Sequence, residues 1–237
     1  MTALETLLAV QARDTTIDQL RHRRETLPER AAMGHNAAAI AAVDAQRAEV
    51  QGRLDEIAGR EAEAEAEIRA GEERIAAIDK RMFSGEVTAS RDLQAMATEI
   101  ESIKARVSAL EDVALAALDE REPVDAELAT LDARRGDLEA EGARLRAAVA
   151  EAEVALDAEI ASESQARAAI AGDLAADLLV TYERLRDRLG GIGAAHLEGG
   201  RCGGCHLSLP ATELDRIKHE PPDALVFCDQ CGRILVR

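Results

Sequence analysis

The sequence predicts a mainly α-helical protein: a long, kinked antiparallel coiled-coil hairpin over residues 1–189, then a small domain of short β-strands over residues 190–237. Three observations predict it. Alanine supplies 49 of 237 residues, with no tryptophan, one tyrosine and two phenylalanines, which is typical of long helices and argues against a TIM barrel, a doubly wound sheet or a β-sandwich. Apolar residues recur at spacings of three and four. All four cysteines lie near the C-terminus.

Two apolar stripes define the arms of the hairpin. The first runs from Ile40 to Met82 and the second from Leu93 to Leu156. A seven-residue repeat held this long implies left-handed supercoiling with a partner helix. In the segment 83–90 between the stripes, Gly85 can end one helix and Ser90 can cap the next, and a short loop makes the two helices antiparallel neighbours. We therefore expect the tip near 83–90, although the same stripe could pair with a second chain.

Glycine and proline punctuate the rest of the helical pattern. Pro28 and Pro123 each remove a backbone donor, so we expect kinks near 28 and 123 and a separate helix over residues 1–27. A last stripe from Leu174 to Leu189 includes Tyr182, which we expect to pack against the C-terminal domain. The run of glycines from Gly190 ends the helical pattern.

The charge is unevenly distributed. The net charge is −17, yet basic and acidic residues balance after Gly199. An acidic hairpin repels phosphate backbones and anionic lipid, which leaves the C-terminal domain as the candidate for any nucleic-acid contact. No stretch approaches the ~20 apolar residues that span a membrane, and no signal peptide is evident. We expect a cytoplasmic protein without membrane contact, in a compartment where clustered cysteines bind metal more often than they form disulfides.

The cysteines form two C-x2-C pairs, Cys202 with Cys205 and Cys228 with Cys231, separated by 22 residues. This pattern suits one tetrahedral Zn²⁺, with each pair forming a tight turn. Four thiolates leave no open position for water, so the zinc is expected to be structural.

Other interpretations of these residues compete with zinc binding. The string Cys202-Gly-Gly-Cys205-His206 also has the C-x-x-C-H form of c-type haem attachment, and a C-x-x-C pair can be a redox motif. Both leave the second pair unexplained. His206 or His219 could replace one thiolate. The sequence shows no nucleophile triad, phosphate loop or dinucleotide fingerprint, which predicts a protein that is not an enzyme and has no small-molecule substrate.

Two further surfaces are candidates for binding. Basic residues beside one aromatic ring could contact RNA or DNA phosphates, but the signal is weak, and the alternative is that these residues only balance the acidic residues nearby. These residues are Arg201, Arg216, Lys218, Phe227, Arg233 and Arg237. At the predicted tip, Met82, Phe83 and Arg91 form a candidate protein-docking point, the alternative being that Phe83 closes the end of the apolar seam.

The whole pattern resembles a known family. The hairpin followed by Cys202-Gly-Gly-Cys205-His206, by Leu209-Pro210 and by Cys228 to Leu235 is similar to bacterial C4-type zinc-ribbon proteins with an N-terminal coiled-coil hairpin. The resemblance implies a zinc ribbon at the end of a kinked hairpin. Some relatives act as chaperone-like adaptors for the sigma factor that serves flagellar genes, and one is thought to bind a flagellin messenger RNA. We transfer only the four zinc ligands from this resemblance.

The sequence thus leads to a non-enzymatic, zinc-binding adaptor in transcription regulation. In this hypothesis the hairpin binds proteins, and the ribbon contacts nucleic acid or a transcription component. The alternative is a purely protein-binding scaffold in which the ribbon is a folded cap.

Overall fold

The computed structural model describes residues 2–221 and 224–237, which group into two compact units. Unit 1 comprises Met1–Ala32 and Leu145–Arg237, and unit 2 comprises Met33–Arg144. In chain order the elements are α1 (Ala3–Glu25), α2 (Pro28–Phe83), α3 (Ser90–Ala171), α4 (Ala176–Arg188), β1 (Ala194–Glu198), β2 (Arg201–Cys202), α5 (Ala211–His219), β3 (Val226–Phe227) and β4 (Ile234–Val236). Among the described helices, none combines the length and apolarity needed to cross a membrane.

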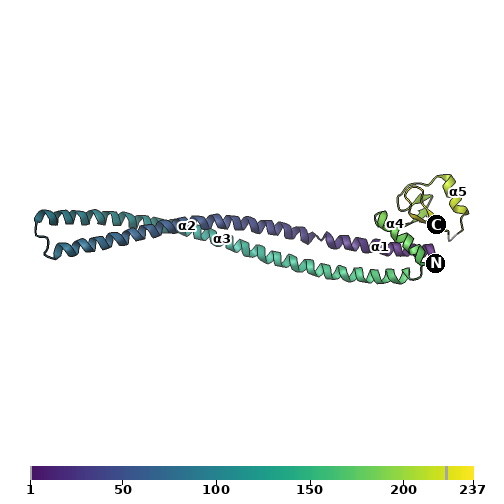
Figure 1. Ribbon diagram of the computed structural model, residues 1–237, viewed down its shortest axis with the longest axis horizontal. Helices are drawn as coiled ribbons and strands as arrows, with labels where there is room; N and C mark the ends of the chain where they lie inside the picture. The colour runs from purple at the N-terminus through teal and green to yellow at the C-terminus, as the bar shows by residue number, and fades with distance from the viewer. Residues whose placement is uncertain (1, 222–223) are drawn as a thin grey trace. The chain divides into compact units, whose positions relative to one another are not determined.

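Unit 2 is an antiparallel pair formed by most of α2 and the first part of α3, which Figure 1 shows side by side and joined by a short loop. The predicted apolar stripes form its seam. The buried seam residues of this unit are Val43, Val50, Leu54, Ile57, Ala64, Ile78, Ile100 and Ala117. Their spacing confirms the predicted helical hairpin and shows that the seam pairs within one chain.

Small residues let the two helices of unit 2 approach closely. A Cβ atom at Gly71 would lie 2.7 Å from a methyl carbon of Val107. Ala64 and Ala117 are almost completely buried. α3 continues through Pro123 as a single helix, and the kink expected there stays a prediction.

Ion pairs flank the seam of unit 2. Arg47 lies 2.5 Å from Asp132, and Arg106 lies 2.7 Å from Glu67. Because these side chains lie at the surface and are at least one-third exposed, each pair contributes at most about 1 kcal/mol. Their main consequence is to favour one register between the arms.

The loop at residues 84–89 is built by local hydrogen bonds. The Ser84 hydroxyl donates to the carbonyl of Arg81 over 2.9 Å, and Gly85 adopts a positive φ of 79°. At the start of α3, the carbonyl of Ala89 accepts hydrogen bonds from the next turn. Ser90 is therefore the first helical residue, so its expected role as the N-cap was wrong by one position.

Unit 1 contains the helix expected over residues 1–27. α1 begins with a capping box between Thr2 and Glu5, which satisfies two backbone donors that a helix start leaves unpaired. The chain leaves α1 after Glu25, and α2 starts at Pro28, where the ring of proline suits the first helical turn.

The core of unit 1 joins α1 and α4 to the first and last strands. It surrounds Tyr182, whose side chain is completely buried, as was expected from the sequence. Its other buried members are Leu4, Leu7, Val10, Ala171, Leu185, Ala194, Ile234 and Val236. The C-terminal strands are thus packed directly on the N-terminal helix.

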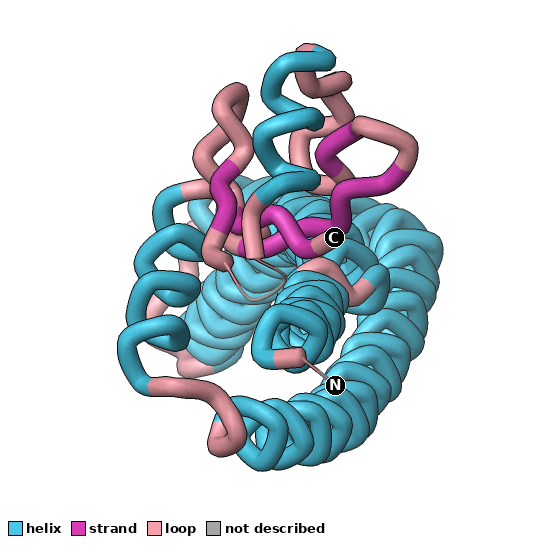
Figure 2. The backbone as a smooth tube through the Cα atoms, turned by 90° about the vertical axis from the view of Figure 1, so that its right-hand side faces the viewer, coloured by secondary structure: helices cyan, strands magenta, loops and turns pink. Residues whose placement is uncertain are grey.

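The C-terminal segment forms a four-stranded sheet in the order β2-β1-β4-β3, drawn in magenta in Figure 2. β1 pairs parallel with β4, with Ala195 opposite Leu235, while β2 and β3 are antiparallel edge strands. α5 places Ile217 in a second small core with Leu209, Val226 and two of the cysteines. The division into domains at residue 190 stays a prediction, because the sheet and the helices beside it belong to one compact unit.

Gly193 lies at a close approach between the segment entering β1 and α4. A Cβ atom there would lie 2.8 Å from the Tyr182 carbonyl oxygen and 3.0 Å from the Arg186 nitrogen. Because backbone atoms cannot move aside cheaply, we expect Gly193→Ala to destabilise unit 1 by about 1–3 kcal/mol. Tyr182 is the only tyrosine and the chain has no tryptophan, so urea unfolding followed by tyrosine fluorescence reports on this unit alone.

Gly172→Ala is the matched control for this measurement. Its Cβ atom would lie no closer than 3.4 Å to its neighbours, so the unfolding midpoint should stay near that of the wild type. Equal midpoints for the two variants would contradict the close approach at Gly193.

Candidate metal centre

The two cysteine pairs lie on two turns with the same hydrogen-bond pattern. In the first turn, the N–H of His206 donates to the carbonyl of Cys202 over 2.8 Å, and the N–H of Cys202 donates to the carbonyl of Leu207. In the second turn, the N–H of Gly232 donates to the carbonyl of Cys228 over 2.7 Å, and the N–H of Cys228 donates to the carbonyl of Arg233. Each C-x2-C pair is therefore held in a rigid turn by backbone contacts.

The residue after each pair has a left-handed backbone. Gly232 has a φ of 74°, and His206 has a φ of 61° at the equivalent position. Glycine adopts this conformation without steric cost, whereas most other residues disfavour it. The histidine ring follows the turn and is exposed.

The two turns face each other and bring the four sulfurs together. Cys202 Sγ lies 4.0 Å from Cys231 Sγ, and Cys205 Sγ lies 4.0 Å from Cys228 Sγ. All four sulfurs lie within 4.8 Å of one another. A tetrahedral zinc site with Zn–S bonds of about 2.3 Å requires sulfurs about 3.8 Å apart, so the cysteines fit one zinc ion. In the described part of the chain no histidine joins this group.

The protein environment does not by itself favour four thiolates. Burial raises the pKa of Cys228 to about 12 and also raises the pKa of Cys202. Burial opposes ionisation of Cys231 as well, but hydrogen bonds from Arg233 lower the pKa of that thiol to about 7. A metal cation held by the four sulfurs would supply the stabilisation that the buried thiolates lack.

The comparisons with known proteins agree with this geometry. Residues 10–190 match the CT398-like coiled coil hairpin domain, and residues 201–235 match the C4-type zinc ribbon domain. The chain belongs to the CT398-like coiled-coil hairpin family. The predicted family, the fold class and the single zinc ion as cofactor are thereby confirmed.

Relatives of this chain occur in mycobacteria. An uncharacterized protein of Mycobacterium tuberculosis is 32% identical over 235 residues, which cover 98% of this chain and 94% of the relative. An uncharacterized protein of Mycobacterium leprae is 28% identical over 225 residues, covering 93% and 94% of the two chains. The names of these two relatives state no function.

Solved structures share the fold. A structure from Mycobacterium smegmatis superposes with a TM-score of 0.91 at 26% identity, covering 100% of both chains. CT398 from Chlamydia trachomatis gives a TM-score of 0.57 at 20% identity, covering 99% of this chain and 97% of the other. HP0958 from Helicobacter pylori gives 0.53 at 18%, covering 99% and 96%. At such low identity, these last two show the fold alone.

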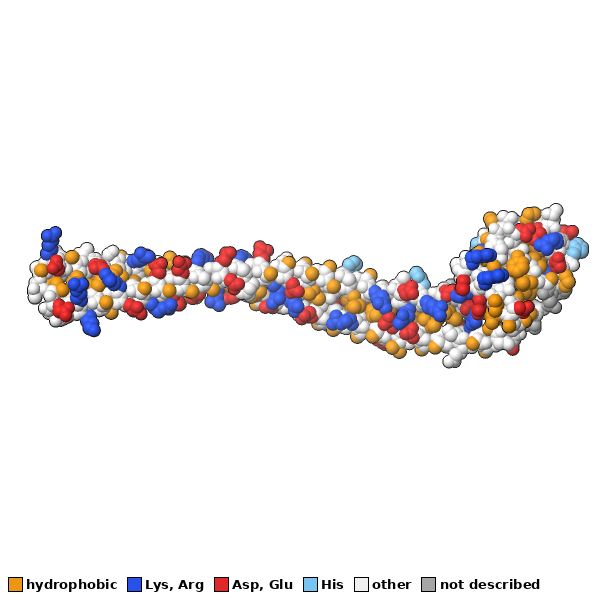
Figure 3. All heavy atoms as spheres, viewed as in Figure 1, with side chains coloured by type: hydrophobic (Ala, Val, Ile, Leu, Met, Phe, Trp, Pro, Cys, Tyr) orange, Lys and Arg blue, Asp and Glu red, His pale blue; other side chains and the backbone are white. Residues whose placement is uncertain are grey.

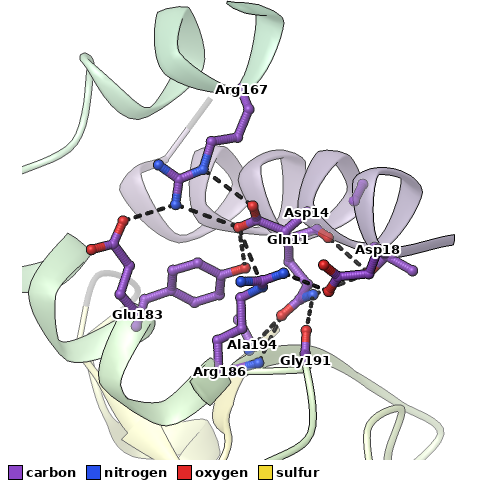
Figure 4. A network of polar contacts seen from close by, with 12 residues as sticks. Gln11, Asp14, Asp18, Arg167, Glu183, Arg186, Gly191 and Ala194 are labelled. Atoms are coloured by element: carbon purple, nitrogen blue, oxygen red, sulfur yellow. Dashed lines mark hydrogen bonds and ion pairs between the residues drawn. The ribbon is translucent and has the colours of Figure 1, made fainter. Parts of the chain in front are cut away.

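Sequence reasoning missed a buried polar network beside the C-terminal ribbon, which is shown in Figure 4. Asp14 accepts a hydrogen bond of 2.8 Å from the Tyr182 hydroxyl and pairs with Arg167 at 3.2 Å. Arg186 pairs with Asp18 at 2.5 Å and lies 3.7 Å from Asp14. α1, α3 and α4 are therefore joined around one carboxylate whose side chain is only 8% exposed.

Gln11 extends the network to the start of the ribbon. Its Oε1 accepts hydrogen bonds from the N–H groups of Gly193 and Ala194, over 2.7 and 3.3 Å, and its Nε2 donates to the Gly191 carbonyl. Gln11 and Asp14 occupy stripe positions between Val10 and Ile17. Polar residues at these positions of an apolar stripe are the signal that could have revealed the network.

Two of the arginines predicted to contact nucleic acid bind backbone carbonyls. Arg233 donates to the carbonyls of Leu189 and Ile192, both over 2.9 Å, at the end of α4. Arg237 donates to the carbonyl of Ile217 over 2.6 Å and to that of Glu220 over 3.0 Å, at the end of α5. Each arginine compensates at least one carbonyl that a helix end leaves unpaired, and Arg233 also binds the Ile192 carbonyl in the segment before β1.

The other four residues predicted to bind nucleic acid differ in their surroundings. Arg216 pairs with Glu213 in two contacts of 3.0 and 2.5 Å, and Arg201 donates to the His206 carbonyl over 3.0 Å. Lys218 is exposed on α5, and Phe227, on edge strand β3, is 39% exposed. The role of all six residues in binding nucleic acid stays a prediction.

The predicted docking residues lie at the hairpin tip. Phe83, the last residue of α2, is 85% exposed, which is the highest value among the exposed large apolar side chains of the described chain. Met82 beside it is half-buried, and Arg91 is exposed at the start of α3. The ring of Phe83 therefore does not close the seam.

Proposed function

We propose that this chain is a non-enzymatic, protein-binding adaptor that docks a partner at the hairpin tip. The zinc ribbon is a folded element that the metal stabilises, and the protein acts in the cytoplasm, where zinc-binding thiols stay reduced. The observation that carries the proposal is the exposed ring of Phe83.

The position of Phe83 supports docking because folding gains little from its side chain. A phenylalanine side chain gains about 1.5–3 kcal/mol when it moves from water to an apolar environment. At 85% exposure most of this gain is unused within the chain. Aromatic side chains that fill a pocket of a partner are among the strongest contributors to protein interfaces. The four-cysteine site supports a structural zinc, since it has no open ligand position.

We expect Phe83→Ser to weaken partner binding by about 10- to 100-fold, the loss that corresponds to burying one phenylalanine ring. The stability of the hairpin should not change, because the ring is outside the seam. The measurement is quantitative co-purification of the full-length chain and its specific partners from its own cells, followed by titration of the partner recovered.

Leu115→Ser is the matched control, because Leu115 is 61% exposed on α3 away from the loop. This variant should bind the partner as the wild type does. Equal binding by the Phe83 and Leu115 variants would refute docking at the tip. Loss of the partner from both would indicate a site on the shaft of the hairpin, which is the part of α2 and α3 in unit 2 away from the loop.

A second candidate function is nucleic-acid contact by the ribbon, with RNA or DNA as the partner. It is supported by Phe227, exposed next to a zinc ligand, and by the exposed Lys218. The carbonyl contacts of Arg233 and Arg237 make the protein-binding scaffold the better-supported function. RNA affinity that falls steeply with salt, and that Phe227→Ala removes, would favour the second candidate.

A further inference from the structure

The cations around Phe83 differ from those of the shaft in having no carboxylate partner. Between residues 80 and 91 the chain carries Lys80, Arg81 and Arg91 against the single acid Glu86. All three cations are exposed, and within the described residues no ion pair involves them. Figure 3 shows basic side chains projecting at this end of the hairpin. The loop and the turns beside it are thus basic only between the flanking acids Asp79 and Asp92, in a chain whose net charge is −17.

Cations along the shaft of the hairpin, unlike those near the loop, have carboxylate partners. Nearly every arginine and lysine of α2 and α3 in unit 2 lies within 4 Å of a carboxylate, either across the seam or one turn away. These residues are Arg47, Arg53, Arg60, Arg69, Arg74, Lys104, Arg106, Arg121, Arg135 and Arg144. The only other unpaired cation of this described unit is Arg134. Unpaired positive charge is therefore concentrated at the tip.

The helix dipole explains the positions of only two of these three cations. Lys80 and Arg81 lie in the last turn of α2, where a cation interacts favourably with the helix dipole. Arg91 lies in the first turn of α3, where the dipole disfavours a cation. Arg91 is therefore compensated neither by the helix dipole nor by an ion pair within the described hairpin.

We propose that the partner docked at the tip presents an acidic protein surface with an apolar pocket that receives Phe83. This inference rests on the proposed docking function and specifies the chemistry of the partner. Lys80, Arg81 and Arg91 pair with its carboxylates, and the ring supplies the apolar contact. Charge complementarity of this kind directs association and selects against partners of the wrong sign.

The arrangement fits a compact acidic protein patch better than a nucleic acid or a lipid surface. Glu86 lies between the cations in the sequence, Asp79 and Asp92 flank them, and the acidic shaft follows directly. A polyanion that extends beyond the tip would meet this negative charge. A local patch of carboxylates around a pocket can contact the cations and avoid the shaft.

The test is photo-cross-linking in the cells that make the protein, using the full-length chain with para-benzoylphenylalanine in place of Phe83. A second chain carries the same cross-linker in place of Leu115 on the shaft. The charge-reversed variant Lys80→Glu/Arg81→Glu/Arg91→Glu is compared with the charge-conserving variant Lys80→Arg/Arg81→Lys/Arg91→Lys. Mass spectrometry identifies the cross-linked peptides, and circular dichroism confirms that both variants keep their helices.

We expect adducts at position 83, and not at 115, with protein segments rich in Asp and Glu. Their yield should fall at least about tenfold in the charge-reversed variant and stay unchanged in the charge-conserving one. Adducts that persist after charge reversal, or that contain nucleic acid or lipid, would overturn this inference while leaving docking at the tip intact. Absence of any adduct specific to position 83 would refute the docking function itself.

Discussion

Cys228→Ser is expected to release the zinc and unfold the ribbon, while α1, α2 and α3 remain helical. The thiol of Cys228 is 1% exposed, and its sulfur lies 4.0 Å from that of Cys205. The remaining apolar core of the ribbon is small, and domains of this size usually need a metal or disulfides to fold. In zinc-finger peptides the metal contributes about 10–16 kcal/mol of apparent binding free energy, which a ribbon with three thiolates cannot replace.

Three measurements check this result together. Zinc content by mass spectrometry should fall from one ion per chain to near zero, and helicity should fall only by the share of the nine-residue α5. Tyr182 fluorescence should change, because Ile234 and Val236 leave the core around this ring. Chelation of the wild-type protein should give the same three changes.

His206→Asn is the control for the ligand assignment. Asparagine tolerates the left-handed backbone of this position, and the exposed ring lies outside the sulfur group. This variant should keep its zinc. Loss of zinc from the His206 variant, with retention in the Cys228 variant, would show that histidine replaces a thiolate.

The parts of the fold that follow local patterns could be predicted from the sequence. Each seam residue, such as Val43 or Val50, is recognised by its spacing from the next one along the same helix. The two C-x2-C spacings of the cysteines likewise predict zinc binding. Such signals need only neighbours along the chain, so the amino-acid sequence alone predicts both the hairpin and the zinc site.

The network around Asp14 could not be predicted in this way, because its partners lie far apart in the sequence. Arg167 is 153 residues away from Asp14 and Tyr182 is 168. A count of basic residues was equally uninformative about Arg233, since it does not show whether a guanidinium faces solvent or, as here, the carbonyls at the end of α4. These contacts form only when α1, α3, α4 and the C-terminal strands pack together.

Asp14→Ala is expected to destabilise unit 1 by about 3–5 kcal/mol, the usual effect of removing one partner from a buried ion pair. The change leaves the buried Tyr182 hydroxyl without its acceptor and leaves Arg167 and Arg186, which are 22% and 18% exposed, without the central carboxylate. Buried polar groups left unpaired carry the full cost of their desolvation. Urea unfolding followed by tyrosine fluorescence measures the change at the site itself.

Two further variants separate charge from shape. Asp14→Asn keeps an oxygen that can accept from the Tyr182 hydroxyl but removes the charge, so its loss should lie between those of the wild type and the alanine variant. Asp157→Ala removes an exposed carboxylate that pairs with Arg24 at 2.9 Å in the same unit, where about 0–1 kcal/mol is expected. If Asp14→Ala cost no more than Asp157→Ala, the network would have no part in holding α1, α4 and the ribbon together.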